Sequence, residues 1–130
     1  MDYKHLSELA VKAKQNALPT YSNFYVGAAI LTNNDKVYTG CNVESSSYSL
    51  TICAERNAIF KAISEGEREF KAIAVAGDTE DYISPCGACR QVINDICGEI
   101  DIVLVNSSGD YIVKKTSELL PLAFGDKDLE

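Results

Sequence analysis

The chain lacks any apolar run that approaches the roughly 20 residues a membrane helix needs. Its first residues, MDYKHLSELAVKAK, lack the apolar segment of a secretory signal, so we expect a cytoplasmic protein. Positive charge is also scarce: 12 Lys and Arg residues face 19 Asp and Glu residues, which leaves a net charge of −7. Such a chain repels a phosphate backbone. We therefore expect no membrane and no nucleic-acid polymer as a partner, and a neutral or cationic small molecule remains compatible.

Histidine occurs once, at His5, whereas cysteine occurs five times. Five cysteines cannot all pair, and a chain without an export signal lies where thiols stay reduced. Metal binding or catalysis is then the better interpretation of any cysteine cluster. His5 is far along the chain from the cysteines, so we expect a solvated side chain there and a metal site made of sulfur alone. Cys41 and Cys97 complete no ligand spacing with the others and are interpreted as structural thiols.

The composition is that of one ordinary globular domain, with 46% hydrophobic and 24% charged residues, and we expect a single domain over residues 1–130. Periodicity predicts the order helix, strand, strand, helix, strand, helix, strand, strand, helix. Strands joined through a helix should be parallel, so the predicted fold class is α/β, a three-layer α/β/α fold with a mixed five-stranded sheet. The predicted segments are 3–17, 24–32, 36–43, 53–64, 70–78, 85–97, 101–105, 111–115 and a short last helix capped by Thr116, with Gly66 and Gly98 ending the second and third helices.

Residues 86–89 read CGAC, a C-x-x-C pair that by itself fits half a zinc site, a redox dithiol or two small core residues. Cys53 changes this balance, because catalytic zinc takes three protein ligands and leaves its fourth position to water. All three cysteines lie at predicted helix starts, where unpaired N–H groups and the helix dipole stabilise thiolates. We therefore predict a Zn²⁺ site formed by Cys53, Cys86 and Cys89.

Two charged residues follow Cys53. Arg56 could donate hydrogen bonds to the thiolates and offset their excess negative charge, although alone it would equally be an exposed helix arginine. Glu55 could carry a proton from an activated water to a leaving nitrogen, although alone it would be an ordinary first-turn glutamate. Residues i and i+2 lie on nearly opposite faces of a helix. Cys53 must therefore lie at the helix start, outside regular helical geometry, for both side chains to reach one cavity.

Together these motifs resemble those of the zinc-dependent cytidine deaminases. TICAE at 51–55 and PCGAC at 85–89 are similar to the family's C-A-E and P-C-x-x-C signatures. Three further segments resemble family segments, and the resemblance covers nearly the whole chain. One departure is Ser49, where the family usually has a glycine. The further segments are YSNFYVGAAI, GCNVESSSY and ELLPLAF.

This resemblance implies hydrolytic deamination of cytidine and 2′-deoxycytidine to uridine and 2′-deoxyuridine, as in pyrimidine salvage, with zinc hydroxide attacking C4 and Glu55 shuttling protons. Asn42 and Glu44 would bind the ribose, Phe24 would pack against the pyrimidine, and the backbone at Ala54 would help to read the base. Short family members with three cysteines are homotetramers. The resemblance therefore also implies a homotetramer, in which Phe124 from a neighbouring subunit approaches the base.

Three other functions compete with this interpretation. A related deaminase could act on another aminated nucleoside, such as a nucleoside antibiotic, but Asn42 and Glu44 favour a plain ribose. A structural zinc module would usually close its site with a fourth protein ligand, and only three are found here. Editing of bases in polynucleotides would need basic contacts along a strand, against which the charge of −7 counts.

Overall fold

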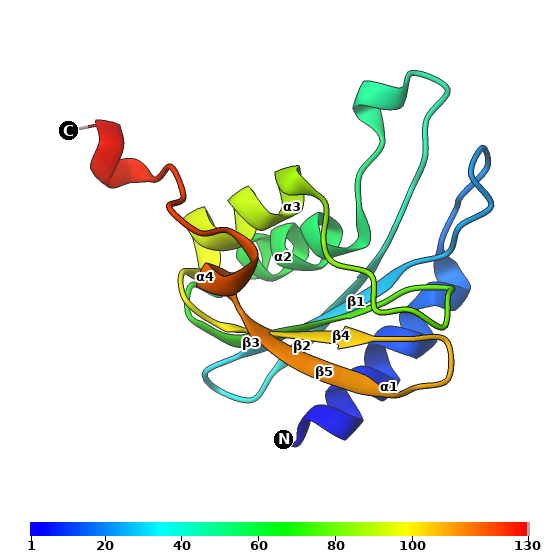
Figure 1. The fold of residues 1–130 in the computed structure, drawn as a ribbon, viewed down its shortest axis with the longest axis horizontal. Helices are drawn as coiled ribbons and strands as arrows, with labels where there is room; N and C mark the ends of the chain where they lie inside the picture. The colour runs from blue at the N-terminus through cyan, green and yellow to red at the C-terminus, as the bar shows by residue number, and fades with distance from the viewer. Residues whose placement is uncertain (130) are drawn as a thin grey trace.

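One mixed sheet forms the middle of the fold. A computed structural model describes residues 1–129, apart from the side chains of residues 126 and 127. Its strands are β1 (Gly27–Thr32), β2 (Val37–Cys41), β3 (Phe70–Ala76), β4 (Asp101–Val105) and β5 (Tyr111–Lys115). They lie in the order β2-β1-β3-β4-β5 (Figure 1). β3 and β4 run parallel, and the other neighbouring pairs are antiparallel. The predicted mixed five-stranded sheet is confirmed.

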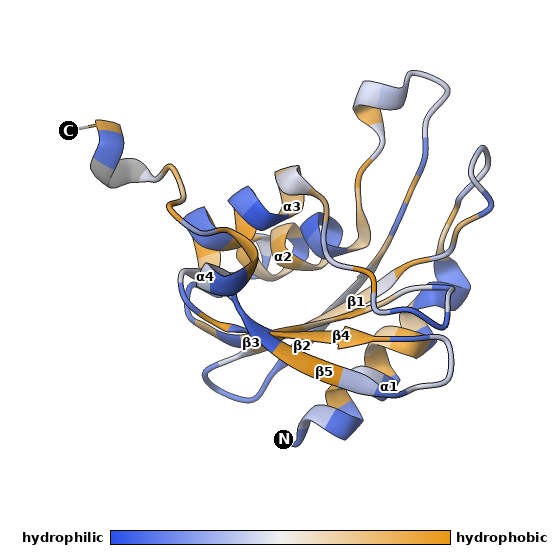
Figure 2. Ribbon diagram, viewed as in Figure 1, coloured by the Kyte–Doolittle hydropathy of each residue, from blue (hydrophilic) through white to orange (hydrophobic). Residues whose placement is uncertain are grey.

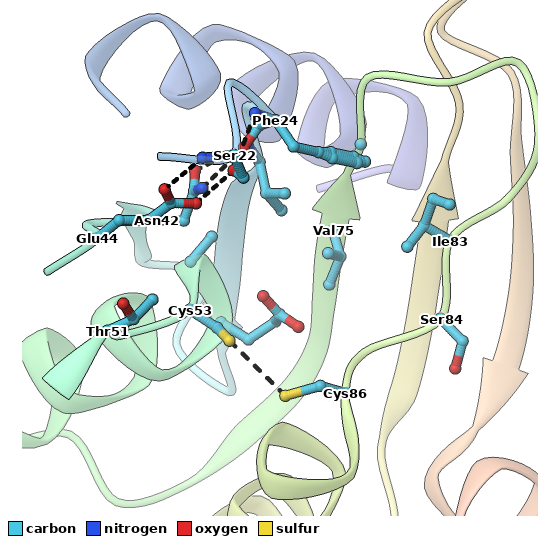
Figure 3. A pocket seen from close by; sticks show the side chains of 14 residues that line it. Ser22, Phe24, Asn42, Glu44, Thr51, Cys53, Val75, Ile83, Ser84 and Cys86 are labelled. Carbon is cyan, nitrogen blue, oxygen red and sulfur yellow. Dashed lines mark hydrogen bonds between the residues drawn. The ribbon is translucent and has the colours of Figure 1, made fainter. Parts of the chain in front are cut away.

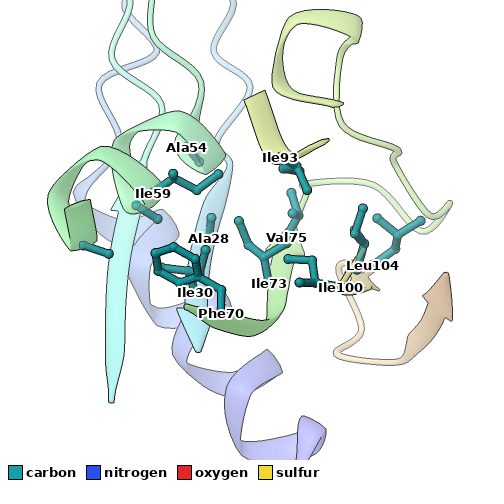
Figure 4. Packing of buried hydrophobic residues seen from close by; sticks show 13 residues of the cluster. Ala28, Ile30, Ala54, Ile59, Phe70, Ile73, Val75, Ile93, Ile100 and Leu104 are labelled. Carbon is teal, nitrogen blue, oxygen red and sulfur yellow. The ribbon is translucent and has the colours of Figure 1, made fainter. Parts of the chain in front are cut away.

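Helices cover both faces of this sheet (Figure 1). They are α1 (Tyr3–Ala13), α2 (Ala54–Ser64), α3 (Gly87–Val92), which continues as a π-helical turn (Ile93–Cys97), and α4 (Thr116–Leu119). Successive residues of β1 alternate between the two faces: Ala28 and Ile30 pack with α2, whereas Ala29 and Leu31 pack with α1. The cluster under α2 is drawn in Figure 4. Three layers therefore bury the sheet on both sides, and the predicted α/β class is confirmed.

The central strands explain why the sequence reads as near-continuous apolar runs at 27–32 and 70–76. All six residues of β1 are buried, and so are six of the seven in β3, with Lys71 exposed. A strand covered on both faces needs apolar side chains at successive positions. Figure 2 shows these strands as largely hydrophobic, while hydrophilic residues gather on the outer turns of the helices.

Two glycines let helices approach the sheet closely. A Cβ atom on Gly40 would lie 2.4 Å from the Ala58 backbone nitrogen and 2.6 Å from the Ala54 carbonyl oxygen, both in α2. A Cβ atom on Gly27 would lie 2.1 Å from the Ala10 carbonyl oxygen in α1. Neither backbone could move aside without displacing its helix. Gly40 therefore sets how close the start of α2 lies to β2.

The glycine helix stops are where the sequence predicts them. Gly66 has φ +97° and follows α2; its N–H donates to the Ile63 carbonyl and the Glu67 N–H to the Ala62 carbonyl, each at 3.0 Å. This pair of bonds forms a Schellman motif. Gly98, with φ +71°, ends the π-helical turn after α3.

Several predicted boundaries are wrong. The first helix ends at Ala13 rather than residue 17, and a 3₁₀ turn, Lys14–Asn16, follows it. The first strand begins at residue 27 rather than 24, because the backbone of Phe24 and Val26 bonds to the Asn42 side chain, at 2.8 and 2.9 Å, instead of a neighbouring strand. Side-chain pairing of this kind leaves no trace in hydrophobic periodicity.

Thr116 is not the N-cap of the last helix. It is the first helical residue and only 2% exposed; its hydroxyl donates to the Gly98 carbonyl at 2.8 Å and accepts from the Ile100 N–H at 3.1 Å. The cap position falls to Lys115, whose backbone N–H donates to the Glu118 carboxylate at 2.9 Å. The hydroxyl is needed to join two segments, so it cannot cap the helix.

After α4 the chain leaves the body of the molecule as a C-terminal segment (Figure 1). Each helix within residues 1–129 falls short of the length or the apolarity that crossing a bilayer requires.

Candidate metal and substrate site

The three predicted metal ligands come together at the starts of two neighbouring helices. Cys53 is the N-cap of α2, with extended backbone angles of φ −71° and ψ 157°, and Cys86 is the N-cap of α3, with φ −64° and ψ 166°. The condition placed on Cys53 is thereby met, since it lies at the helix start and outside helical geometry. Cys89 lies one turn into α3 and is buried.

The spacing of the sulfur atoms fits a metal ion. The Sγ atoms of Cys53, Cys86 and Cys89 all lie within 4.8 Å of one another, and those of Cys53 and Cys86 are 3.6 Å apart (Figure 3). Four ligands around zinc at about 2.3 Å would place sulfurs about 3.8 Å apart. Three thiolates form a soft donor set of the kind that zinc prefers. The cluster therefore fits Zn²⁺ without a large rearrangement.

Arg56 lies against these thiols as predicted. Its Nη2 donates to the Cys53 Sγ at 3.5 Å, and its Nε is buried with no hydrogen-bond partner among the described residues. The pKa of Cys53 falls to about 5, first because the Cys89 thiol donates a hydrogen bond to it and then because Arg56 does. The same bond to Cys53 raises the pKa of Arg56. A cation at this place stabilises a thiolate cluster.

Glu55 is the charged group buried beside the cysteines. It is 4% exposed and lines the same cavity as Cys53 and Cys86. Burial raises the pKa of its carboxyl to about 7, and the negative charge of Cys53 adds to the effect. A first-turn glutamate serving only the helix dipole would lie in solvent, so its burial favours a chemical role.

A cavity of about 280 Å³ opens in front of Glu55 and the cysteines, which is enough for one small molecule. Its wall is mostly apolar, and its polar side chains gather at two places: beside the cysteines and at the opposite end, around Glu44 (Figure 3). Phe24, half-buried, and Ala54, buried, both line this wall, and their predicted contacts with a base stay predictions. The lining residues are Ser22, Phe24, Val26, Asn42, Glu44, Thr51, Cys53, Ala54, Glu55, Val75, Gly77, Ile83, Ser84 and Cys86.

Asn42 and Glu44 line the cavity and also hold its wall. The Asn42 Oδ1 accepts from the Val26 N–H at 2.9 Å, and its Nδ2 donates to the Phe24 carbonyl at 2.8 Å. Glu44 accepts from the N–H groups of Tyr21 and Ser22, each at 2.9 Å, and from the Ser22 hydroxyl. These bonds from Ser22 lower the pKa of the Glu44 carboxyl. The wall-holding role of both residues was not predicted from the sequence.

Phe124 does not line the cavity of its own chain. It lies in the C-terminal segment and is 56% exposed, and its carbonyl accepts a hydrogen bond from the Gln91 side chain at 2.8 Å. The other cysteines are apart from the cluster: Cys41 ends β2, and burial raises the pKa of Cys97 to about 12. His5 is exposed on α1, as expected.

Sequence reasoning missed the wall formed by Val75, Gly77, Ile83 and Ser84. One signal was available: Val75 and Gly77 lie at the carboxyl end of β3, a strand predicted to be parallel to its neighbour. Ligands of open α/β sheets bind at that end. Ile83 and Ser84 lie in a loop without periodicity, so nothing in the pattern marked them.

Comparison with known proteins agrees with this geometry. A family model described as "Cytidine and deoxycytidylate deaminase zinc-binding region" matches residues 1–105. A cytidine deaminase of Sporosarcina psychrophila is 50% identical over 130 residues, covering 99% of this chain and 96% of the relative. A blasticidin-S deaminase of Bacillus cereus is 32% identical over 108 residues, covering 77% of this chain and 76% of the relative.

Solved structures extend the similarity to the fold. The crystal structure of a cytidine deaminase from Burkholderia pseudomallei superposes with a TM-score of 0.92 at 49% identity, and the match covers 95% of this chain and all of that one. The matched family model spans the convergent cysteines, the adjacent Glu55 and all the residues that line the cavity. The chain therefore belongs to the cytidine and deoxycytidylate deaminase zinc-binding family.

Proposed function

We propose that this protein is a zinc-dependent cytidine deaminase, which converts cytidine and 2′-deoxycytidine with water into uridine and 2′-deoxyuridine and releases ammonia. The observation that carries the proposal is the convergence of three cysteine sulfurs with a buried carboxylate at one end of a small apolar cavity. In such a reaction, which serves pyrimidine salvage, water oxygen replaces the exocyclic nitrogen at C4 of the base.

Cys53, Cys86 and Cys89 would hold the zinc. Zinc bound by three protein ligands lowers the pKa of a water molecule toward neutrality. The thiolates are held at the starts of α2 and α3, where helix N–H groups and Arg56 offset their charge. We assign Arg56 this charge-balancing role, because its guanidinium already donates to the Cys53 sulfur.

Glu55 is the proposed proton carrier. It takes the proton that the water gives up and delivers it to N3 of the pyrimidine as oxygen adds to C4. It then takes the proton of the new hydroxyl group on C4 and transfers it to the amino group, which leaves as ammonia while C4 becomes a carbonyl. Its burial beside the sulfurs keeps the carboxylate away from bulk water, so that the proton passes between substrate atoms and one fixed group.

The rest of the cavity would orient the nucleoside. Phe24 offers a ring to the pyrimidine, and the backbone at Ala54 faces the base from the start of α2. Asn42 keeps one N–H of its amide beyond the bond to Phe24, and Glu44 retains acceptor capacity on its carboxylate. A ribose hydroxyl can donate to a carboxylate and accept from an amide, so both residues suit the sugar.

We further propose a cytoplasmic homotetramer in which residues 1–130 of each subunit form one catalytic domain. Support comes from apolar side chains that the single chain leaves exposed in the turn before α2 and on the C-terminal segment: Tyr48, Leu50, Leu122 and Phe124. In the tetramer Phe124 of one subunit would approach the base bound by another. Light scattering that gave a monomeric mass at assay concentrations would remove this part of the proposal.

A second candidate is favoured by one observation, the similarity to a blasticidin-S deaminase. The chain could instead act on another aminated nucleoside, such as a nucleoside antibiotic. Ammonia release from cytidine, 2′-deoxycytidine and blasticidin S, each before and after zinc removal with a chelator, separates the two. Release from the two plain nucleosides supports the first proposal, and release from blasticidin S alone supports the second. Bound zinc with no release from any cytosine derivative would indicate a structural zinc module.

A further inference from the structure

The connection between β3 and α3 forms one wall of the cavity and then supplies a metal ligand. Gly77, Ile83 and Ser84 line the cavity, and two residues after Ser84 the chain reaches Cys86 (Figure 3). The first half of this connection is bonded to the turn after β4, where the Ser107 N–H donates to the Thr79 carbonyl at 2.7 Å. The second half of the connection, which ends at Cys86, is held by other contacts.

Arg90 provides that support. Its Nε donates to the Pro85 carbonyl at 2.8 Å, its Nη2 to the Ser84 hydroxyl at 2.5 Å, and its Nη1 to the Leu119 carbonyl at 3.0 Å. All three nitrogen atoms of the guanidinium are thus used. Two of them hold the residues just before Cys86, and the third reaches the end of α4.

We infer that Arg90 is a positioning residue of the site, which fixes the Ser84–Pro85 connection, and through it Cys86 and the adjacent wall, against α4. The inference rests on the proposed function for its kinetic part. Arg90 does not line the cavity itself and follows the buried ligand Cys89 directly in α3. Any effect of this side chain on metal or substrate must therefore pass through the residues that it holds.

Arginine is required at this position because three acceptors in three directions need a planar, preformed fork. A lysine has one nitrogen and cannot meet acceptors at both the Nε and Nη positions. The bond to Leu119 also satisfies a carbonyl at the last turn of α4, one of the groups that a helix leaves unpaired. The neighbouring Gln91 bonds to the Phe124 carbonyl in the C-terminal segment at 2.8 Å. Consecutive residues of α3 therefore connect the metal ligand to that segment.

The test compares Arg90→Gln and Arg90→Lys with a matched control, Arg68→Gln. Arg68 also donates to two backbone carbonyls, those of Ile63 and Glu67 at 2.9 and 2.7 Å, but at the far end of α2 from the cavity. Zinc transfer to a chromogenic chelator is measured on the zinc-loaded proteins. KM and kcat for cytidine are measured per bound zinc, and hydrogen exchange is followed over 83–86 and 120–124.

Both Arg90 variants should lose zinc about 10- to 100-fold more readily than the wild type, as for other residues that orient metal ligands. KM should rise more than zinc-normalised kcat falls, because Ile83 and Ser84 line the cavity and would contact substrate in the ground state as well as in the transition state. Hydrogen exchange of the backbone amides should become faster over 83–86 and 120–124 in both Arg90 variants. The control Arg68→Gln should leave zinc transfer and KM unchanged.

The inference is overturned if the Arg90 variants lose only thermal stability, as Arg68→Gln does, while zinc transfer, KM and exchange stay at wild-type values. Should Arg90→Gln fail to fold, Ser84→Ala removes one of the three acceptors and must shift zinc transfer in the same direction. If no protein, wild type included, releases ammonia while the zinc difference persists, the positioning role stands and the proposed function fails.

Discussion

Replacing Asn42 with alanine should destabilise the protein and weaken substrate binding while leaving zinc in place. The side chain is 8% exposed and makes two hydrogen bonds to backbone groups, to the Val26 N–H and the Phe24 carbonyl. Each such bond contributes about 1 kcal/mol, and a buried polar group left unpaired costs about 1–3 kcal/mol. Water can reach the cavity side and satisfy part of the loss, so we expect about 2–3 kcal/mol in the free energy of unfolding.

Denaturant unfolding of Asn42→Ala measures this cost, at fixed protein concentration because assembly contributes to apparent stability. The matched control is Asn34→Ala, which removes an exposed amide from the turn between β1 and β2. It should change stability by less than about 0.5 kcal/mol. The amide of Val26 should lose hydrogen-exchange protection, KM should rise, and zinc content should stay at the wild-type level.

An Asn42→Ala protein as stable as the control, with Val26 still protected, would refute this reasoning. Asn42 would then act on substrate alone and would not hold the wall of the cavity.

Two further predictions concern the scaffold. Gly40→Ala should lower the free energy of unfolding by about 1–3 kcal/mol or more and weaken zinc binding, because its Cβ would press on the backbone of α2 at Ala58. In the control Gly125→Ala the new Cβ would have no atom closer than 3.8 Å, so unfolding and zinc binding should change little. Equal effects of the two substitutions would contradict the close approach of α2 to Gly40. Burial, and then the hydrogen bond to Asp101 at 2.5 Å, raise the pKa of Tyr3 from 10.0 to about 12. The stability that Tyr3 contributes should therefore be fully present below pH 10 and disappear as pH rises from 10 to about 12. The unfolding free energies of wild type and Tyr3→Phe should converge over that pH range. A difference that stays constant with pH would contradict the raised pKa of Tyr3.

Much of the fold is predictable from the sequence because its signals are local. β1 and β3 are apolar at nearly every position, α2 begins after an extended cysteine and ends at a glycine with positive φ, and β4 and β5 flank a clear turn. Parallel pairing of β3 and β4 follows from the helix between them. These features give the element order and the three layers without tertiary information.

The boundaries fail where side chains from distant segments replace backbone pairing. Residues 24–26 have the composition of a strand, but the Asn42 amide takes up the backbone groups that a strand would use. Thr116 is an N-cap candidate by residue type, yet its hydroxyl bonds to Gly98 and Ile100 and so joins that stretch to the start of α4. Neither the contacts of Asn42 nor those of Thr116 can be recognised from the periodicity of hydrophobic residues or from secondary-structure propensity.

For the site, the spacing of cysteines with an adjacent carboxylate was sufficient to predict which side chains converge. The condition on Cys53 followed from helix geometry, and its extended backbone meets it. What could not be predicted is the support around them: the part of the cavity wall formed by Ile83 and Ser84 lies in a loop, and Arg90 is brought to that loop by the tertiary fold. The predicted contact of Phe124 with the base lies between subunits and stays a prediction.

The most direct test of the central claim is ammonia release from cytidine by wild-type protein and by Glu55→Gln at equal zinc content. Glutamine keeps the size and burial of the side chain but cannot carry the proton. We predict that the variant binds zinc as the wild type does and that turnover falls by about 100- to 10,000-fold or more. Zinc-loaded Glu55→Gln that deaminates cytidine at near wild-type rates would contradict the assignment of this carboxylate and, with it, the proposed mechanism.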